Sequence, residues 1–451
     1  MPLASVVRHV LSAALIVGLG APASAAALVV PSDPLFAEQW ALQRGASLDG
    51  PLAWGLAGTG AGTTVAVLDT GIDANHPDLR GALWANPDEV AGNGVDDDRN
   101  GWVDDVHGVD LIRGDGTPED EEGHGTHVSG LIAAAHDGSG IAGLAPGARI
   151  MAVKVLDAER NGATSGVAAG IRYALAQGAD VINVSVNGDT PSRSLVEAVA
   201  ASDAAGVPVV ASAGNDGRDL DALPSYPAAF DVPTVLSVAG GTKAGLLAAF
   251  SNFGLRTVDL VAPGEEILST APGGGYEYRS GTSMAAPSAT ATLALLHGAR
   301  GDLSGAQLVA ALRTSARRSA GLAGLLRTGQ LDPVAALRAV LPADRVAAVG
   351  AAAAELTLTA RVARRGKRPV ATRRAGSRSR APAARRLLVT WRLSGSGAGV
   401  AAFEVTAGGR TLAARGATGR GAWLRTRERR VRITALDAEA GRLASVVVRL
   451  R

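Results

Sequence analysis

The feature that most restricts the fold is an alternation between two kinds of segment from about residue 60 to residue 340. Short β-branched runs that are apolar on both faces predict buried strands, and longer Ala-rich stretches between them predict helices. The expected strands are 63–69, 149–156, 180–186, 207–213 and 234–240, and the expected helices are 124–136, 166–178, 194–206, 305–316 and 331–341. This alternation predicts an α/β fold of three layers, α/β/α, in which a mainly parallel sheet has helices on both faces.

The pattern changes beyond residue 340. Apolar and polar residues alternate there in five segments, which predicts the half-exposed strands of a small antiparallel β-sandwich over residues 346–451. These segments are 354–363, 386–395, 401–409, 429–437 and 444–451. A basic stretch with Pro and Ser, at about 363–386, is expected to form an Arg-rich loop within this C-terminal domain.

The net charge of +2 conceals a strong asymmetry. From residue 345 onward about 24 Lys and Arg stand against about 5 Asp and Glu, whereas the preceding part has an acidic excess. A basic domain of this kind attracts an anionic cell-surface polymer, although a merely solvated linker is the alternative interpretation. The Arg-rich loop has no interleaved aromatic residues to stack on bases, so no specific nucleic-acid partner is expected.

The first 25 residues are typical of a signal peptide. Arg8 and His9 precede an apolar run, and Ala23 and Ala25 offer a site for cleavage near Ala25. A buried N-terminal helix is the alternative. No later stretch reaches the roughly 18 continuous apolar residues of a membrane span. We therefore expect a secreted, extracellular protein without a transmembrane segment in the mature chain.

Four polar residues fall where the predicted sheet would bring them together. Asp69 ends one expected strand and Asn215 follows another, while His124 and Ser283 stand where helices begin. In open parallel sheets, ligands bind at the carboxyl ends of the strands. Each residue also has a structural interpretation, since Asp69 and Asn215 suit turns and Ser283 suits a helix N-cap.

The four residue types together suit nucleophilic catalysis. A serine hydroxyl is a weak nucleophile until a neighbouring base takes its proton, and an imidazole with a pKa near 6.5 fits that task. A carboxylate fixes the tautomer of the imidazole, and an amide N–H stabilises a developing oxyanion. The chain contains no cysteine, which excludes a cysteine nucleophile, disulfides and thiolate zinc sites.

Seven motifs occur in an order that resembles one known family. They are VAVLDTGIDANHPDL (65–79), GHGTHVSGLIAA (123–134), INVSVNG (182–188), SAGNDG (212–217), FSNFG (250–254), VAPG (261–264) and SGTSMAAP (280–287). Over roughly residues 33–340 the chain resembles the subtilisin-like serine proteases, or subtilases. An esterase of the α/β-hydrolase class is excluded, because that class needs G-x-S-x-G around the serine and places the histidine last.

The resemblance implies a subtilisin-like catalytic domain over residues 26–340. It implies that Asp69 is the orienting carboxylate, His124 the general base, Ser283 the nucleophile and Asn215 the oxyanion-hole side chain. The expected activity is that of a secreted, calcium-stabilised serine endopeptidase of broad specificity, a monomer acting on polypeptides. A catalytically idle subtilase fold that serves as a binding module is the alternative, and the four filled positions argue against it.

The resemblance also implies a cleft in which an extended peptide pairs with the backbone. Its expected residues are Ser185, Val186, Asn187, Gly188, Asn161, Gly162, Ser212, Ala213 and Gly214. Apolar or medium-sized side chains are expected before the scissile bond. Two positions depart from the family: Asn187 stands where glycine is usual, and Ser288 stands where a histidine usually follows the proline.

Calcium is the expected cofactor, in a structural role. Residues 93–105 place oxygen-bearing side chains at alternate positions before a turn glycine, as in the first half of an EF-hand loop. The expected ligands are Asp96, Asp98 and Asn100, completed by Asp104 or Asp105. A solvated acidic loop is the alternative. The resemblance implies a second calcium site through Asp78 and Asp137, with Gln39.

Overall fold

The computed structural model describes residues 28–347, residue 349 and a set of strands between residues 357 and 449. The expected signal peptide and nearly all of the Arg-rich loop lie outside the described residues. Among the described residues, no helix combines the length and the apolar composition that crossing a bilayer requires.

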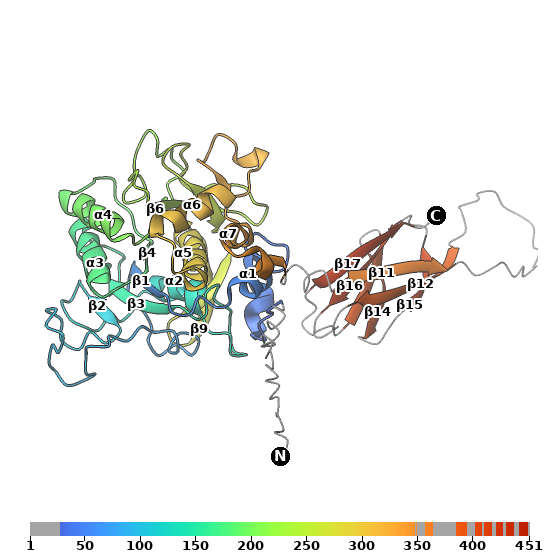
Figure 1. Ribbon diagram of the computed structural model, residues 1–451, viewed down its shortest axis with the longest axis horizontal. Helices are drawn as coiled ribbons and strands as arrows, with labels where there is room; N and C mark the ends of the chain where they lie inside the picture. Colours follow the sequence, from blue (N-terminus) through green and yellow to red (C-terminus); the bar gives the residue numbers. More distant parts are fainter. Residues whose placement is uncertain are drawn as a thin grey trace, which may run out of the picture.

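The centre of the main body is an eight-stranded sheet in which every neighbouring pair is parallel (Figure 1). The strand order is β10-β7-β6-β5-β4-β1-β3-β2. The strands are β1 (Thr64–Asp69), β2 (Gly108–Asp110), β3 (Arg149–Lys154), β4 (Val181–Val184), β5 (Val209–Ser212), β6 (Val235–Gly241), β7 (Leu260–Pro263) and β10 (Gly329–Gln330). The parallel sheet and all five expected strands are confirmed, and β2, β7 and β10 are additional.

Helices cover both faces of this sheet, because the strands are apolar on both sides. They are α1 (Gly50–Ala57), α2 (His124–Ala133), α3 (Thr164–Ala176), α4 (Arg193–Ala205), α5 (Thr282–Ala299), α6 (Gly305–Ser315) and α7 (Pro333–Val340). Val65 and Val67 of β1 face the core formed with α1, α2, α5, α6 and α7. Ala66 and Leu68 face the core formed with α3 and α4, which lie side by side in Figure 1. The three-layer α/β/α architecture is therefore confirmed.

Four smaller elements complete the main body. A two-stranded antiparallel hairpin, β8 (Ile267–Ala271) and β9 (Gly275–Arg279), leads into α5. Three short 3₁₀ helices are η1 (Pro34–Glu38), η2 (Trp40–Leu42) and η3 (Ala320–Leu322). The hairpin places its last residue, Arg279, four positions before Ser283, so it helps to fix the start of α5.

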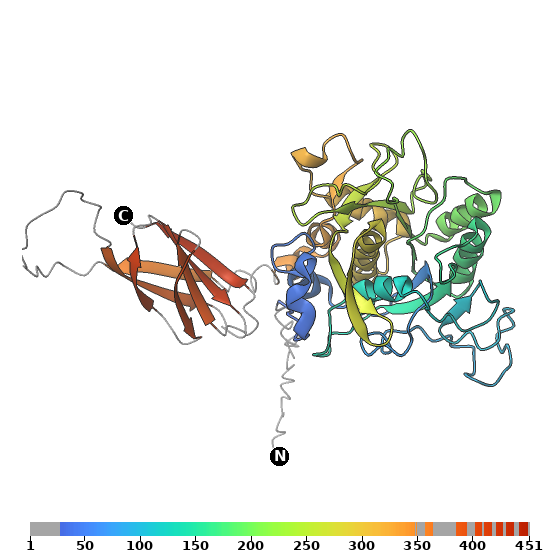
Figure 2. The same ribbon diagram turned by 180° about the vertical axis from the view of Figure 1, so that it is seen from behind.

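The C-terminal strands form two antiparallel sheets (Figure 2), as expected for a small β-sandwich-like domain. Their orders are β11-β12-β15 and β14-β13-β16-β17. The strands are β11 (Thr357–Ala363), β12 (Arg385–Ser394), β13 (Ala402–Ala407), β14 (Arg410–Gly416), β15 (Gly421–Thr426), β16 (Arg430–Leu436) and β17 (Arg442–Arg449). Five of these correspond to expected strands, and β14 and β15 are additional.

Candidate active site

The carboxyl edge of the parallel sheet gathers the candidate residues. Asp69 is the last residue of β1, which lies between β3 and β4 in the middle of the sheet. Asn215 lies three residues beyond the end of β5. His124 is the first residue of α2, and Ser283 is the second residue of α5. Residues more than 200 positions apart in the chain thus reach one edge, as the strand order requires.

Asp69 and His124 form a direct pair. Oδ1 of Asp69 lies 2.7 Å from Nδ1 of His124. Both side chains are buried, with 0% and 3% of their surface exposed. The backbone N–H of Thr70 also donates to Oδ1 of Asp69, at 2.8 Å. Because the carboxylate of Asp69 can only accept, Nδ1 of His124 carries the proton, and Nε2 of the imidazole is left as an acceptor.

Ser283 does not cap its helix. The N-cap of α5 is Gly281, and no side chain caps it, so the structural interpretation of this serine is wrong. Its hydroxyl instead donates to the carbonyl of Ser185 at 3.2 Å, and within the described residues it makes no hydrogen bond to His124. Hydrogen bonds between a nucleophile and its base are often loose without substrate and tighten in the complex.

A proline inside α5 ties Ser283 to the end of β4. Pro287 has no N–H, so the carbonyl of Ser283 lacks its usual partner four residues on. The hydroxyl of Ser185 donates to that carbonyl at 3.4 Å, and the hydroxyl of Ser283 donates to the carbonyl of Ser185. Asn183 donates to the same Ser185 hydroxyl at 2.8 Å and accepts from Thr290 of α5 at 2.8 Å. Ser283 and the residues at the end of β4 are therefore held as one unit.

The side chain of Asn215 has a fixed orientation. Its Oδ1 accepts from the backbone N–H of Thr282 at 2.8 Å and from the Thr282 hydroxyl at 3.0 Å. The Thr282 hydroxyl in turn accepts from the N–H of Gly214 at 3.1 Å. Because two groups donate to this atom, it is the amide oxygen, and the other terminal atom of Asn215 is the NH₂ nitrogen. The Nδ2 donors remain for a ligand in the pocket that Asn215 and Ser283 both line.

That pocket has a volume of about 230 Å³. Seven of the nine expected cleft residues line it, namely Gly162, Ser185, Val186, Asn187, Gly188, Ser212 and Gly214. The other two do not. Ala213 is fully buried, and the backbone of Asn161 closes a turn with Asp157 through bonds of 2.7 and 2.9 Å.

Sequence patterns missed several other lining residues. Leu156, Val167 and Leu195 make part of the wall apolar, and Arg160 is the one charged residue in the part of the lining that the structure describes. The peptide bond from Tyr226 to Pro227, which is cis, forms another part of the wall. Tyr226 and Gly188 exchange two backbone hydrogen bonds of 2.8 and 2.9 Å. The backbone of Gly188 is therefore occupied and does not pair with a peptide.

The side chain of Asn187 lies against Gly214, a position that has no room for a Cβ. Gly214 has φ +101°, and a Cβ there would lie 2.3 Å from Nδ2 of Asn187 and 2.5 Å from Nδ2 of Asn252. The amide of Asn187 thus packs on the backbone next to Asn215. Asn187 is also one of the residues that line the pocket.

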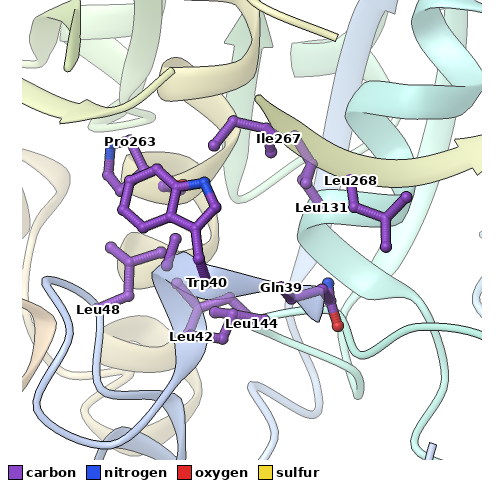
Figure 3. Close-up of a pocket in the computed structure, with 11 residues that line it drawn as sticks. Gln39, Trp40, Leu42, Leu48, Leu131, Leu144, Pro263, Ile267 and Leu268 are labelled. Carbon is purple, nitrogen blue, oxygen red and sulfur yellow. The ribbon is translucent and has the colours of Figure 1, made fainter. Parts of the chain in front are cut away.

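Ser288 of α5 lines a small cavity that is separate from the pocket beside Ser283. The cavity has a volume of about 30 Å³, and apart from Ser288 and Gln39 its lining is apolar. Figure 3 shows the Trp40 ring extending toward Pro263, with Leu48 close by. The indole N–H of Trp40 donates to the carbonyl of Glu266 at 3.0 Å. The departure at Ser288 therefore affects packing behind the helix.

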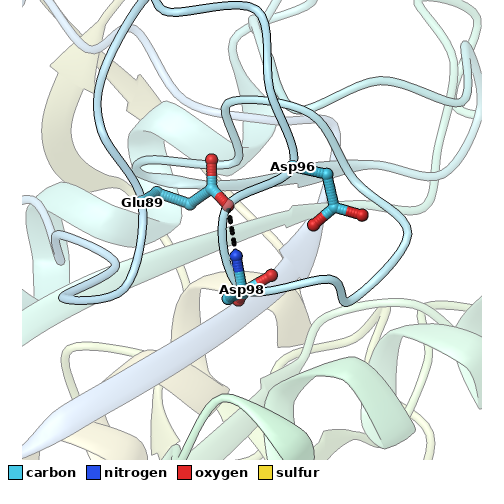
Figure 4. Close-up of side chains that lie close together, drawn as sticks. All are labelled: Glu89, Asp96 and Asp98. Carbon is cyan, nitrogen blue, oxygen red and sulfur yellow. Dashed lines mark hydrogen bonds between the residues drawn. The ribbon is translucent and has the colours of Figure 1, made fainter.

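Three acidic side chains converge in the loop between β1 and β2. Within the described residues, Glu89, Asp96 and Asp98 offer oxygens that all lie within 4.8 Å of one another (Figure 4). One oxygen of Glu89, Oε2, is buried without a partner. Burial would raise the pKa of Asp98, but hydrogen bonds from Asn86 and Gln177 hold it below its ordinary value. The sequence pattern had not indicated Glu89.

The other expected ligands of this loop are engaged elsewhere. Asn100 donates to Asp98 and Asp105 at 2.9 and 2.8 Å and turns its oxygen to a backbone N–H. Asp104 accepts from three consecutive backbone N–H groups, at 92–94. Asp105 is fully buried and accepts from the Tyr173 hydroxyl at 2.6 Å. These residues shape the loop around the cluster of Glu89, Asp96 and Asp98.

A second acidic group surrounds the loop at 137–141. Asp78 accepts from Ile141 N–H at 3.0 Å, and Asp33 accepts from the N–H groups of Asp137 and Gly138 at 3.2 Å. Oδ1 of Asp78 and Oδ2 of Asp33 are buried without partners. Burial, the largest cause, raises the pKa of Asp78. Asp33 was missed by the sequence analysis.

Gln39, which was expected to join this group, has both ends of its amide engaged with the backbone. Its amide exchanges two hydrogen bonds with the backbone of Ala142, of 2.9 and 2.8 Å. Gln39 therefore fixes the loop from behind, while the unpartnered carboxylate oxygens belong to Asp33 and Asp78.

Comparison with known proteins identifies the family. The model of the subtilase family of peptidases matches residues 60–331, which is more than half of the chain. The chain belongs to the subtilase family. This subtilase is 36% identical over 310 residues to thermitase of Thermoactinomyces vulgaris, covering 68% of this chain and 99% of that protein. It is 41% identical over 249 residues to the major intracellular serine protease of Bacillus subtilis, covering 54% and 72% of the two chains.

A solved structure agrees with the sequence relatives. A protease from Pseudoalteromonas arctica matches this subtilase with a TM-score of 0.56 and 30% identity, over 69% of this chain and 99% of that one. The resemblance drawn from the motifs is thereby confirmed. This subtilase is a serine-type endopeptidase, a hydrolase that acts on polypeptide substrates.

Proposed function

We propose that this subtilase cleaves peptide bonds by acyl transfer to Ser283, with His124 as general base and Asp69 as the orienting carboxylate. The observation that supports this most directly is the buried Asp69–His124 bond of 2.7 Å at the sheet edge where α5 begins. A helix N-terminus also provides backbone N–H groups and a favourable dipole for a developing negative charge.

The proposed reaction follows from these positions. Nε2 of His124 takes the proton of Ser283 as the hydroxyl oxygen attacks the scissile carbonyl. Asp69 stabilises the imidazolium that forms. The oxyanion accepts from the N–H of Ser283 and from Nδ2 of Asn215. His124 then returns its proton to the leaving amine, and water releases the acyl group by the same route in reverse.

The cleft suits broad specificity. Neutral residues dominate its lining, and three aliphatic side chains, Leu156, Val167 and Leu195, provide apolar surface. We therefore infer a preference for apolar or medium-sized side chains before the scissile bond. Among the described residues that line the pocket none is acidic, so a preference for basic side chains there is not expected.

We propose that the enzyme is stabilised by calcium. Three carboxylates within 4.8 Å repel one another unless a cation lies between them, and oxygen-only ligand sets favour calcium. Glu89, Asp96 and Asp98 would hold one ion. Asp33, Asp78 and Asp137 are the candidates for a second, supported by the two orphaned oxygens of Asp33 and Asp78.

Chelation is expected to lower the melting temperature by about 4 °C. Occupancy at 100 times Kd contributes about 2.7 kcal/mol, and each kcal/mol shifts the Tm of a domain of roughly 300 residues by about 1.5 °C. Differential scanning fluorimetry with chelator and with restored calcium measures this. Glu89→Gln should reduce the calcium-dependent shift, whereas Glu159→Gln, an exposed acid elsewhere, should not. A Tm that is equal with and without calcium would contradict the proposal that calcium stabilises the enzyme.

Secretion and the role of the C-terminal domain are also proposals. The charged, apolar and small-residue regions of residues 1–25 support export and cleavage near Ala25. The basic excess beyond residue 345 supports attachment to an anionic cell-surface polymer rather than to a specific nucleic acid. We propose a monomer with domain limits at 26–340 and 346–451.

Covalent labelling tests the proposed nucleophile. Phenylmethanesulfonyl fluoride should modify Ser283 alone, as one adduct located by mass spectrometry of the peptide that contains α5. Ser283→Ala should not be labelled. The neighbouring Ser185, whose hydroxyl contacts Ser283, gives a matched control, because Ser185→Ala should still be labelled at Ser283. An adduct of equal yield in Ser283→Ala would refute the assignment.

A further inference from the structure

Thr70, the residue after Asp69, uses every polar atom it has. Its N–H donates to Oδ1 of Asp69 at 2.8 Å, and its carbonyl accepts from Nζ of Lys154 at 2.6 Å. Its hydroxyl donates to Asp120 at 2.7 Å and accepts from the N–H of Gly125 at 2.9 Å. Thr70 is fully buried and does not line the substrate pocket. One side chain therefore connects the Asp69 strand with the segment that begins α2.

Asp120 organises the segment on both sides of His124. It accepts from the N–H groups of Gly123 and Thr126 at 2.7 and 2.8 Å, and from the Thr126 hydroxyl at 2.6 Å. Burial would raise the pKa of Asp120, but bonds from Thr126, Gly123 and Thr70 hold it below its ordinary value. A charged acceptor of this kind makes strong hydrogen bonds.

Lys154 holds Thr70 from the neighbouring strand. It is the last residue of β3 and lies beside Asp69 in the register of the sheet. Its side chain is 2% exposed, and Nζ also pairs with Glu121 at 2.5 Å. A buried ammonium needs such partners, so this geometry is costly to change. Lys154 therefore holds the carbonyl of Thr70, and Asp69 holds its N–H.

We infer that Thr70 is a positioning residue for the reaction proposed above. Through Asp120 and Gly125 it sets where His124 stands, and through its N–H it sets where Asp69 stands. Loss of the Thr70 hydroxyl removes neither Asp69 nor His124, but it frees the segment that carries His124 to shift. Because a misplacement of about 1 Å can cost on the order of 100-fold in rate, kcat should fall while substrate binding is retained.

Two substitutions at one position test the inference in the full-length enzyme. Thr70→Val keeps the shape and removes the hydroxyl, and it should lower kcat by roughly 10–100-fold with KM changed less than about 3-fold. Thr70→Ser restores the hydroxyl and should return kcat to within about 3-fold of wild type. The readout is steady-state hydrolysis of a quenched fluorescent peptide, corrected for the folded fraction by a melting curve.

The matched control is Thr234, which is also buried and donates its hydroxyl to a carboxylate, Asp203, at 2.9 Å. Thr234 lies at the amino end of β6, at the opposite edge of the sheet, so Thr234→Val should leave kcat unchanged. Wild-type kcat in Thr70→Val, or equal losses in the Val and Ser variants, would overturn the inference. If Thr70→Val does not fold, Asp120→Asn replaces it, and wild-type kcat there has the same meaning.

Failure of this inference differs from failure of the proposed function. Full turnover by Ser283→Ala contradicts the assigned nucleophile. Full turnover by Thr70→Val beside an inactive Ser283→Ala contradicts only the positioning role of Thr70.

Discussion

Replacing Ser283 with alanine is expected to reduce kcat by on the order of 10⁶, with KM nearly unchanged. That magnitude was established on subtilisin, a relative of this chain, and is expected here because the substitution removes the proposed nucleophile. Alanine is a good helix former, and Ser283 lies inside α5 without capping it, so the fold should persist. The measurement is hydrolysis of a chromogenic peptide with wild type and variant at equal folded concentration.

Ser269 gives the control for this substitution. It is a buried serine whose hydroxyl donates to a backbone carbonyl, that of His127, at 2.7 Å, much as Ser283 donates to Ser185. Ser269→Ala removes a comparable hydrogen bond and is expected to retain wild-type kcat. Turnover by Ser283→Ala within 10-fold of Ser269→Ala would mean that another group is the nucleophile.

Asp69→Asn is expected to lower kcat by about 10⁴-fold. The amide keeps the size of the carboxylate but has no charge beside Nδ1 of His124, where the 2.7 Å bond now lies. The imidazolium that forms when Nε2 takes the proton of Ser283 is then no longer stabilised by an anion. Steady-state kinetics measure the loss, and proton NMR should show that the low-field Nδ1–H signal disappears.

Asp203→Asn is the control for charge removal at a partly buried aspartate. Asp203 accepts from Thr234 at 2.9 Å, away from the carboxyl edge of the sheet, and its amide variant should keep wild-type kcat. An Asp69→Asn enzyme that keeps more than about a tenth of wild-type kcat would show that the carboxylate does not orient the base.

The sheet could be predicted because burial on two faces leaves a strong pattern. Strand β1 is apolar at its four inner positions, and the gathering of polar residues at its end follows from the rule that parallel strands share a carboxyl edge. By contrast, β10 has two residues, Gly329 and Gln330, and no pattern could indicate it. Its pairing with β7 depends on contacts with residues about 70 positions away.

The finer parts of the site could not be predicted for a related reason. Glu89 joins Asp96 and Asp98 only because the loop folds back on itself, and its spacing matches no ligand pattern. Asp33 approaches Asp78 across the molecule, through the loop that follows α2. The bond between Ser283 and Ser185 arises from a missing N–H at Pro287, which only the helix geometry reveals.

The site draws on residues far apart along the chain, and this spacing fixes when the proposed activity can begin in a newly made protein. Strand β1, with Asp69, is translated early, but Ser283 leaves the ribosome about 214 residues later. At 5–20 residues per second this interval is roughly 10–40 s. During that time the nascent chain carries the proposed base and its orienting carboxylate but not the proposed nucleophile, so the proposed activity cannot begin before Ser283 has been made.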